Sequence, residues 1–136
     1  MADQIIQLKN NSDNLFPTMP REEYTFDVTY AGAPGLITAV KRGGLVWLYI
    51  SIGDSTVLSN AVNNETLFTL PANLRSANSS LITGHARTLG AWANATYYIV
   101  MARVESNGNV NIVGNISDLQ KCRYIVLNGI YETNAN

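Results

Sequence analysis

Two short turn signals, each between a pair of apolar segments, most constrain what this chain can fold into. They are the dipeptides Gly43-Gly44 and Asn107-Gly108. Such dipeptides adopt the positive φ angles of the tight turns that join two antiparallel strands. The sequence therefore predicts two β-hairpins. Their strands are expected at 36–42 and 45–52 for the first, and at 97–105 and 110–113 for the second.

The other apolar segments also have the length and residue types of strands. In segment 24–30, aromatic or apolar residues alternate with polar ones, which is the pattern of a half-buried strand. β-Branched and aromatic residues dominate, and the charged i, i+4 faces of helices are missing. Further strands are expected at 66–70, 80–85 and 122–131. About eight strands predict an all-β fold, either a small antiparallel β-barrel or a jelly-roll-like sandwich.

The first 22 residues differ from the rest of the chain. Turn-forming residues fill 10–14 ("NNSDN"), and 15–20 ("LFPTMP") carries two prolines, which do not fit a central strand. The length of 136 residues suits one domain. We therefore expect an N-terminal arm over 1–22 and a single β-barrel domain over 23–136.

The composition argues against several classes of protein. Charged residues make up 14%, against about 25% in typical domains, and the net charge is −1. A nucleic-acid binder needs a concentrated basic surface, so that class is not expected. No apolar stretch reaches the roughly 18 residues that span a bilayer, so a membrane partner is not expected either. Residues 1–4 lack a basic or apolar run, so we expect no signal peptide and synthesis in a cytoplasm.

One strand has apolar residues on both of its faces. In segment 97–105, three apolar residues face one way, and Tyr97, Ile99 and Met101 face the other. A small barrel buries only one face of each strand, so the other face needs a second surface to cover it. A symmetric partner is the simplest source, which predicts a homo-oligomer. A homo-oligomer would also explain the low fraction of charged residues, because part of each subunit's surface would be buried against its partners.

The residues that could support catalysis are sparse. The ten acidic residues contain no i, i+2 pair on a strand, and the chain has one histidine and one cysteine. A catalytic triad, a zinc site and a calcium site are therefore unsupported, and we expect no enzyme, no metal and no cofactor. The single Cys122 excludes an internal disulfide and is expected in a buried strand. Trp47, within the apolar segment 45–52, is expected in a core that is covered on both sides.

The segment "SLITGHARTLGAW" (80–92) holds the strongest candidates for binding. It contains the only histidine, His85, together with Arg87 and Trp92, and Asn94 and Tyr97 follow. An aromatic face can lie under the apolar side of a sugar ring, while planar polar groups bond its hydroxyls. The residues alone leave two interpretations open. Either these side chains bind a saccharide, or Trp92 and His85 pack within the fold, as buried tryptophan and histidine commonly do.

Several stretches resemble a known family when they are taken in order. They are 35–60 ("GLITAVKRGGLVWLYISIGDSTVLSN"), 69–75 ("TLPANLR") and 84–95 ("GHARTLGAWANA"). Together they resemble the head domain of the receptor-binding proteins of lactococcal-type siphophages, the lower baseplate proteins at the tail tip. The end, 124–131 ("YIVLNGIY"), is similar to the closing strand of phage tail-fibre tips, and 5–18 is similar to the lead-in of phage tail proteins.

The resemblance implies a small antiparallel β-barrel head that assembles as a homotrimer and binds host cell-wall polysaccharide. It implies that Trp92 stacks on the sugar, while His85, Tyr97 and Arg103 bond hydroxyls or a phosphate. Arg87 remains a candidate from the residues themselves. The family also has a His-x-Asp pair on the strand after the Gly-x-Trp element. Here that strand reads "TYYIVMAR" (96–103), so Tyr97 or Tyr98 would replace the histidine, and Arg103 or Arg123 would supply the arginine.

The expected function is therefore adhesion of a phage tail tip to host saccharide. The protein would be made in the host cytoplasm and would work in the virion, and the arm 1–22 would join it to other tail or baseplate proteins. One alternative is a structural tail or baseplate subunit that binds no glycan. A cellular jelly-roll lectin or signalling domain is a third possibility, disfavoured because no secretion signal is visible.

Overall fold

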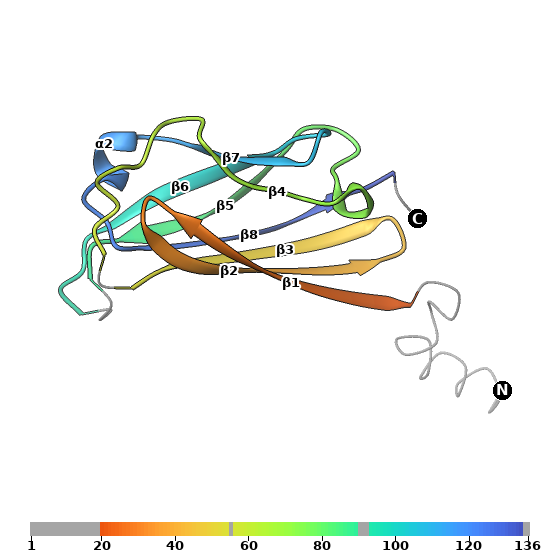
Figure 1. Ribbon diagram of the computed structural model, residues 1–136, viewed down its shortest axis with the longest axis horizontal. Coiled ribbons are helices and arrows are strands. Elements are labelled where there is room, and N and C mark those ends of the chain that lie inside the picture. The colour runs from red at the N-terminus through yellow and green to blue at the C-terminus, as the bar shows by residue number, and fades with distance from the viewer. Residues whose placement is uncertain (1–19, 55, 90–92, 135–136) are drawn as a thin grey trace, which may run out of the picture.

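A single antiparallel sheet of eight strands curls into a nearly closed barrel in the computed structural model, which describes residues 20–54, 56–89 and 93–134 (Figure 1). The strands lie in the order β1-β2-β3-β8-β5-β6-β7-β4. Their bounds are Arg21–Tyr30 (β1), Ala33–Arg42 (β2), Leu45–Gly53 (β3), Thr66–Thr69 (β4), Ser80–Arg87 (β5), Tyr97–Val104 (β6), Asn109–Val113 (β7) and Tyr124–Glu132 (β8). The predicted all-β class is confirmed, and all eight expected strands are present.

The two predicted hairpins are confirmed. β2 and β3 pair around Gly43-Gly44, and β6 and β7 pair around Asn107-Gly108. Gly43 has a φ of 59° and Gly108 a φ of 97°, conformations that side chains disfavour. Gly44 does not adopt a positive φ, so only the first glycine of that pair has the expected conformation.

The barrel closes where its two edge strands meet. The ring of Phe26 on β1 lies 5.0 Å from the ring of Phe68 on β4, measured between centroids. β1 follows the alternation expected for 24–30, because Val28 and Tyr30 are buried while Thr25 and Thr29 are exposed. Aromatic packing therefore covers a seam that the β1 and β4 backbones do not close by pairing.

The ends of the barrel are covered by short helical turns. The 3₁₀ turn η1 (Ala72–Leu74) receives two hydrogen bonds from inward-facing side chains: Lys41 Nζ donates to Asn73 O at 3.0 Å, and Tyr131 Oη donates to Leu74 O at 2.6 Å. The one-turn helix α2 (Ile116–Leu119) lies at the other end (Figure 1). Neither turn was expected, since elements this short leave no periodic pattern.

The inward residues of the strands form one core, and two predictions about it need correction. Val46 and Leu48 point inward, so Trp47 between them points outward and is 36% exposed. The prediction that Trp47 lies in the core is therefore wrong for the single chain. Cys122 is fully buried as expected, but it precedes β8 instead of lying in a strand, and burial raises the pKa of its thiol to about 11.

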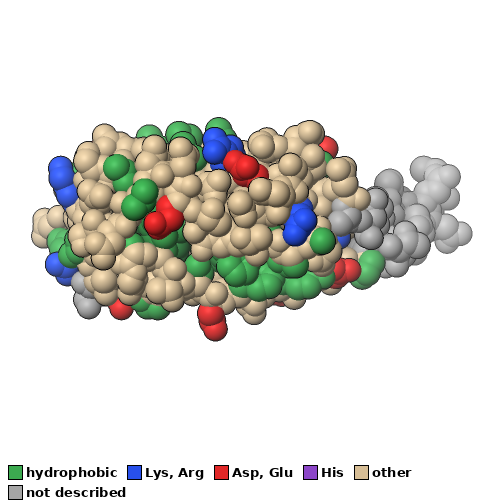
Figure 2. Space-filling model, turned by 45° about the horizontal axis from the view of Figure 1, so that its top comes forward, with side chains coloured by type: hydrophobic (Ala, Val, Ile, Leu, Met, Phe, Trp, Pro, Cys, Tyr) green, Lys and Arg blue, Asp and Glu red, His purple; other side chains and the backbone are tan. Residues whose placement is uncertain are grey.

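Little charge is visible on the face of the barrel that Figure 2 shows. Figure 2, in which the top of Figure 1 is turned forward, shows charged side chains scattered singly or in pairs among uncharged and apolar groups. Among the described residues, no helix is long and apolar enough to cross a membrane. The described part of the chain also contains no group of three or more His, Cys, Asp or Glu side chains placed to hold a metal ion.

Candidate functional site

Three neighbouring strands bring the main candidate side chains together on the outer surface. Arg87, the last residue of β5, pairs with Tyr97 on β6 and with Tyr124 on β8. Residues directly opposite each other on neighbouring strands share a face of the sheet, with Cβ atoms about 4.5–5.5 Å apart. A row of Tyr124, Arg87 and Tyr97 therefore runs across three strands. His85 lies two residues before Arg87 and faces the same way.

The side chains of this row contact one another directly. The Arg87 guanidinium carbon lies 4.8 Å from the centroid of the Tyr124 ring, which is the geometry of a cation–π contact. Arg87 Nη1 lies 3.4 Å from His85 Nε2, within hydrogen-bond distance. The His85 and Tyr97 rings meet edge to face, with centroids 5.9 Å apart. We name His85, Arg87, Tyr97 and Tyr124 the Arg87 cluster.

The Arg87 cluster lies where the β5–β6 loop leaves and rejoins the sheet. The ends of this loop are joined by two hydrogen bonds: Thr88 N donates to Thr96 O at 3.2 Å, and Thr96 N donates to Thr88 Oγ1 at 3.1 Å. Trp92, the predicted stacking residue, belongs to this loop but lies outside the described residues. These two hydrogen bonds hold the two ends of the loop together, next to Arg87 and Tyr97.

The close approach of β5 and β8 places Arg87 opposite Tyr124. A Cβ atom added at Gly84 on β5 would lie 1.8 Å from Val126 O on β8, far inside any possible contact. Only glycine fits here, and it lets β5 come near enough to pair with β8 from Thr83 to Arg87. The register that sets Arg87 against Tyr124 thus depends on this glycine.

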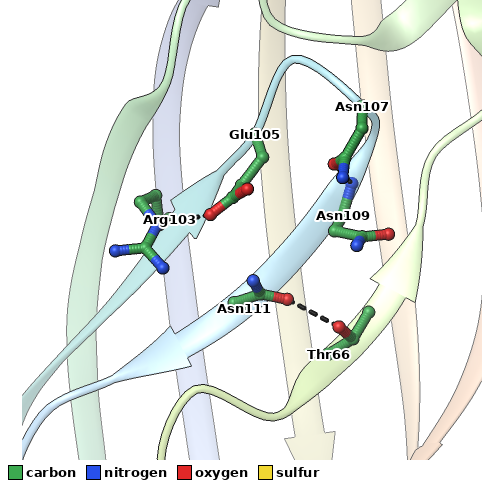
Figure 3. Close-up of polar contacts among 6 residues, drawn as sticks. All are labelled: Thr66, Arg103, Glu105, Asn107, Asn109 and Asn111. Carbon is green, nitrogen blue, oxygen red and sulfur yellow. Dashed lines mark hydrogen bonds and ion pairs between the residues drawn. The ribbon is translucent and has the colours of Figure 1, made fainter.

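The structure separates Arg103 from the other candidates. Arg103 lies at the opposite end of β6, six residues from Tyr97, which is about 20 Å along a strand. Its Nε forms an ion pair of 2.6 Å with Glu105 Oε1 (Figure 3). Arg103 therefore belongs to a different surface, close to the turn between β6 and β7.

Sequence reasoning missed Tyr124 as a member of the site. In the sequence, Tyr124 stands at the start of the closing strand, 37 positions after Arg87 along the chain. No local pattern states which residue of one strand faces which residue of a strand so distant in sequence. The only feature of the sequence that could have marked Tyr124 as a site residue is an aromatic side chain at the end of a strand.

The Arg87 cluster suits recognition more than catalysis. A guanidinium presents a planar fork of donors that matches carboxylate, phosphate or paired hydroxyl oxygens. Tyr97 is 42% exposed, so part of its side chain is accessible from solvent. Stacking on Tyr124 and contact with His85 limit the orientations of the guanidinium, which lowers the entropy lost when a ligand binds.

These features define the class of protein: a small antiparallel β-barrel that carries an aromatic and cationic cluster on its outer surface. Comparison of the chain with known protein families and with curated proteins found no match.

Proposed function

We propose that this chain is the receptor-binding head of a phage tail tip, which assembles as a homotrimer and adheres to saccharide on the host cell surface. The observation that carries the proposal is the Arg87 cluster, in which an oriented guanidinium lies between a tyrosine ring and an imidazole. The resemblance of 35–60, 69–75 and 84–95 to phage receptor-binding heads supports the same function.

The chemistry of the cluster favours a saccharide that carries anionic groups. The Arg87 fork suits a phosphate or carboxylate, and Tyr97 offers both an apolar ring and a hydroxyl. Trp92, on the loop whose ends meet beside Arg87, would add a stacking surface for a sugar ring. Together these residues supply the three kinds of contact that an acidic sugar polymer offers: charge, hydroxyl and apolar ring face.

An outer apolar face supports assembly with further copies of the chain. We give this name to the outward side chains Trp47 (β3), Ile130 (β8), Leu81 (β5) and Ile99 (β6), which lie on four consecutive strands of the sheet. Ile99 is 83% exposed, Ile130 66% and Leu81 59%. Single exposed apolar residues are ordinary, but a set this large on adjacent strands is typical of an interface.

A second copy of the same chain is the occupant that fits this face. Between its apolar members lie uncharged side chains, including Thr83 and Asn128, which pair across β5 and β8. At the edge of the face Leu81 pairs with Arg103, whose charge is neutralised by the ion pair with Glu105. Such a face can meet an identical face without repulsion between like charges. His85 pairs with Ile99 on one side and Val126 on the other, so the Arg87 cluster borders the proposed interface.

Assembly would convert weak sites into firm adhesion. An open surface cluster is expected to bind one saccharide unit weakly, at about millimolar strength, and several linked copies raise the overall strength by orders of magnitude. In the proposed virion, the arm 1–22 would join the head to other tail or baseplate proteins. Residues 1–19 of that arm lie outside the described residues, and β1 begins at Arg21.

A glycan array that carries neutral, phosphorylated and uronic-acid-containing bacterial polysaccharides tests the function. The full chain should bind a subset of acidic polymers, and Arg87→Gln should weaken that binding about tenfold or more, because a charge-assisted hydrogen bond contributes about 1.5–3 kcal/mol. Arg75→Gln, at the η1 end of the barrel, should bind like the natural chain. Trp92→Ala that folds normally should also bind less.

Three results would count against the proposal as a whole or against its site. If the full chain binds no polysaccharide on the array and no bacterial cells, saccharide adhesion is rejected. If that non-binding chain instead docks tail proteins only while residues 1–20 are present, the protein is a structural tail subunit. Equal binding by the natural chain, Arg87→Gln and Arg75→Gln would keep adhesion but reject the Arg87 cluster as its site.

A further inference from the structure

A second polar surface lies on the outer side of β4, β7 and the end of β6. Thr66 and Thr69 on β4 pair with Asn111 and Asn109 on β7, and Arg103 on β6 pairs with Asn111 from the other side. Figure 3 shows Arg103, Asn111 and Thr66 on three adjacent strands. We name these five residues the asparagine surface.

The two asparagine side chains are held in fixed orientations. Thr66 Oγ1 donates to Asn111 Oδ1 at 2.7 Å, and Thr69 Oγ1 donates to Asn109 Oδ1 at 2.9 Å (Figure 3 shows the first of these). Each bond uses the oxygen of an amide, so each Nδ2 is left with two donor hydrogens. Within the described residues, neither Nδ2 has a protein partner.

Asparagine is a poor choice for these positions on grounds of strand stability alone. Outward positions of a strand favour threonine and β-branched or aromatic residues, and asparagine is depleted there. Here it occupies two successive outward positions of the five-residue strand β7. The cross-strand threonines hold both amides in place, so the strand presents two oriented donor groups to solvent.

The charge next to the asparagine surface is neutralised. The Arg103 Nε bonds Glu105 Oε1 at 2.6 Å, so the guanidinium is paired with a carboxylate while its side chain stays 39% exposed. A paired arginine attracts anions less than an isolated one, but its remaining N–H groups still donate to neutral oxygens. The surface therefore favours hydroxyl groups over phosphate.

An apolar strip adjoins these donors. Met101 on β6 and Val113 on β7 pair with each other, one outward position along from the pair Arg103 and Asn111. Both side chains are partly exposed. A pyranose has a face of C–H groups and a rim of hydroxyls, which match an apolar strip beside a row of donors.

We propose that the asparagine surface is a second saccharide site, specific for neutral sugars. Hydroxyls of the sugar accept from Asn109 Nδ2, Asn111 Nδ2 and the Arg103 guanidinium, and its C–H face lies on Met101 and Val113. This site borders the outer apolar face, because Met101 pairs with Thr83 and Arg103 pairs with Leu81. It lies apart from the Arg87 cluster and would bind whether or not that cluster does. A polymer of alternating neutral and acidic sugars could then contact both surfaces of one barrel.

Nuclear magnetic resonance of the ¹⁵N-labelled full chain tests the site through the side-chain amides themselves. The probes are glucose, galactose, mannose and N-acetylglucosamine, each titrated into the millimolar range, with glucose 1-phosphate as the anionic counterpart. At least one neutral sugar should move the Nδ2 signals of Asn109 and Asn111 in a saturable way. Glucose 1-phosphate should instead act mainly on signals of the Arg87 cluster.

Matched substitutions separate a binding site from a stabilising pair. Asn111→Thr should weaken binding of the neutral sugar about tenfold, while Asn60→Thr, at an exposed asparagine in the loop between β3 and β4, should bind it like the natural chain. If none of the four neutral sugars moves the two amide signals, or if both variants bind equally well, the proposal is overturned. Because Arg87→Gln leaves this surface intact, the readout also distinguishes failure here from failure of the Arg87 cluster.

Discussion

Arg87 and Tyr124 lie directly opposite each other on β5 and β8, with the guanidinium carbon 4.8 Å from the ring centroid. The two residues are 37 positions apart in the chain, and the strand register is what joins them. Tyr97 completes the row from the other side. The proposed adhesion site depends on this register more than on any single side chain.

Replacement of Tyr124 tests that dependence. Tyr124→Leu removes the ring below Arg87, while Tyr124→Phe keeps it. A cation–π contact at an exposed site contributes about 0.5–1 kcal/mol, so Tyr124→Leu should weaken binding of acidic polysaccharide about two- to fivefold. Tyr124→Phe should bind like the natural chain. Equal weakening by both variants in a titration would assign the effect to the hydroxyl and contradict the stacking role.

Gly84→Ala should disrupt the register itself. The added Cβ would meet Val126 O at 1.8 Å, so β5 and β8 would have to separate. We expect the free energy of unfolding to fall by about 3 kcal/mol or more, measured by urea denaturation. Thr25→Ala, at an exposed outward position of β1, should cost less than about 1 kcal/mol. Similar stability of the two variants would show that the close approach is not required.

Much of the fold was predictable, since its signals are local. The alternation in 24–30 and the turn at Asn107-Gly108 each need only a few residues to be recognised. The orientation of Trp47 was not predictable, because segment 45–52 is apolar on both faces and so does not state which face points inward. Tyr124 and the separation of Arg103 from Tyr97 were missed for a different reason: pairing between distant strands leaves no mark in a local pattern.

The buried Lys41 side chain should stabilise the closed end of the barrel. Lys41 is 5% exposed, and its Nζ donates to Asn73 O in η1 at 3.0 Å. Lys41→Met keeps the aliphatic volume but leaves that carbonyl without this donor, which should lower the free energy of unfolding by about 1–3 kcal/mol. Lys121→Met, on an exposed side chain, should change it by less than about 0.5 kcal/mol. Thermal or urea unfolding of both variants compares the two, and no loss in Lys41→Met would contradict the role.

Cys122 should make stability depend on pH in the alkaline range. Burial raises the pKa of its thiol from 9.0 to about 11, so the folded state holds the proton more tightly than the unfolded state does. The stabilising effect is complete below pH 9 and is lost as pH rises from 9 through 11, by at most about 3 kcal/mol. The raised pKa values of Tyr30 and Tyr131 act in the same direction, so Cys122→Ala is the necessary comparison.

The measurement for Cys122 is urea unfolding of both proteins from pH 8 to pH 11. The stability advantage of the natural chain over Cys122→Ala should shrink across that interval. A constant difference between the two proteins would show that the thiol titrates alike in the folded and unfolded states.

The central claim is that the outer apolar face, with Ile99 83% exposed in the single chain, is covered by further copies of the same chain. Sedimentation equilibrium of the full chain measures this most directly. The account predicts a mass of three times 14.8 kDa, and predicts that Ile99→Lys shifts the protein toward the mass of a single chain. A natural chain that remains a folded monomer of 14.8 kDa at high concentration would contradict it.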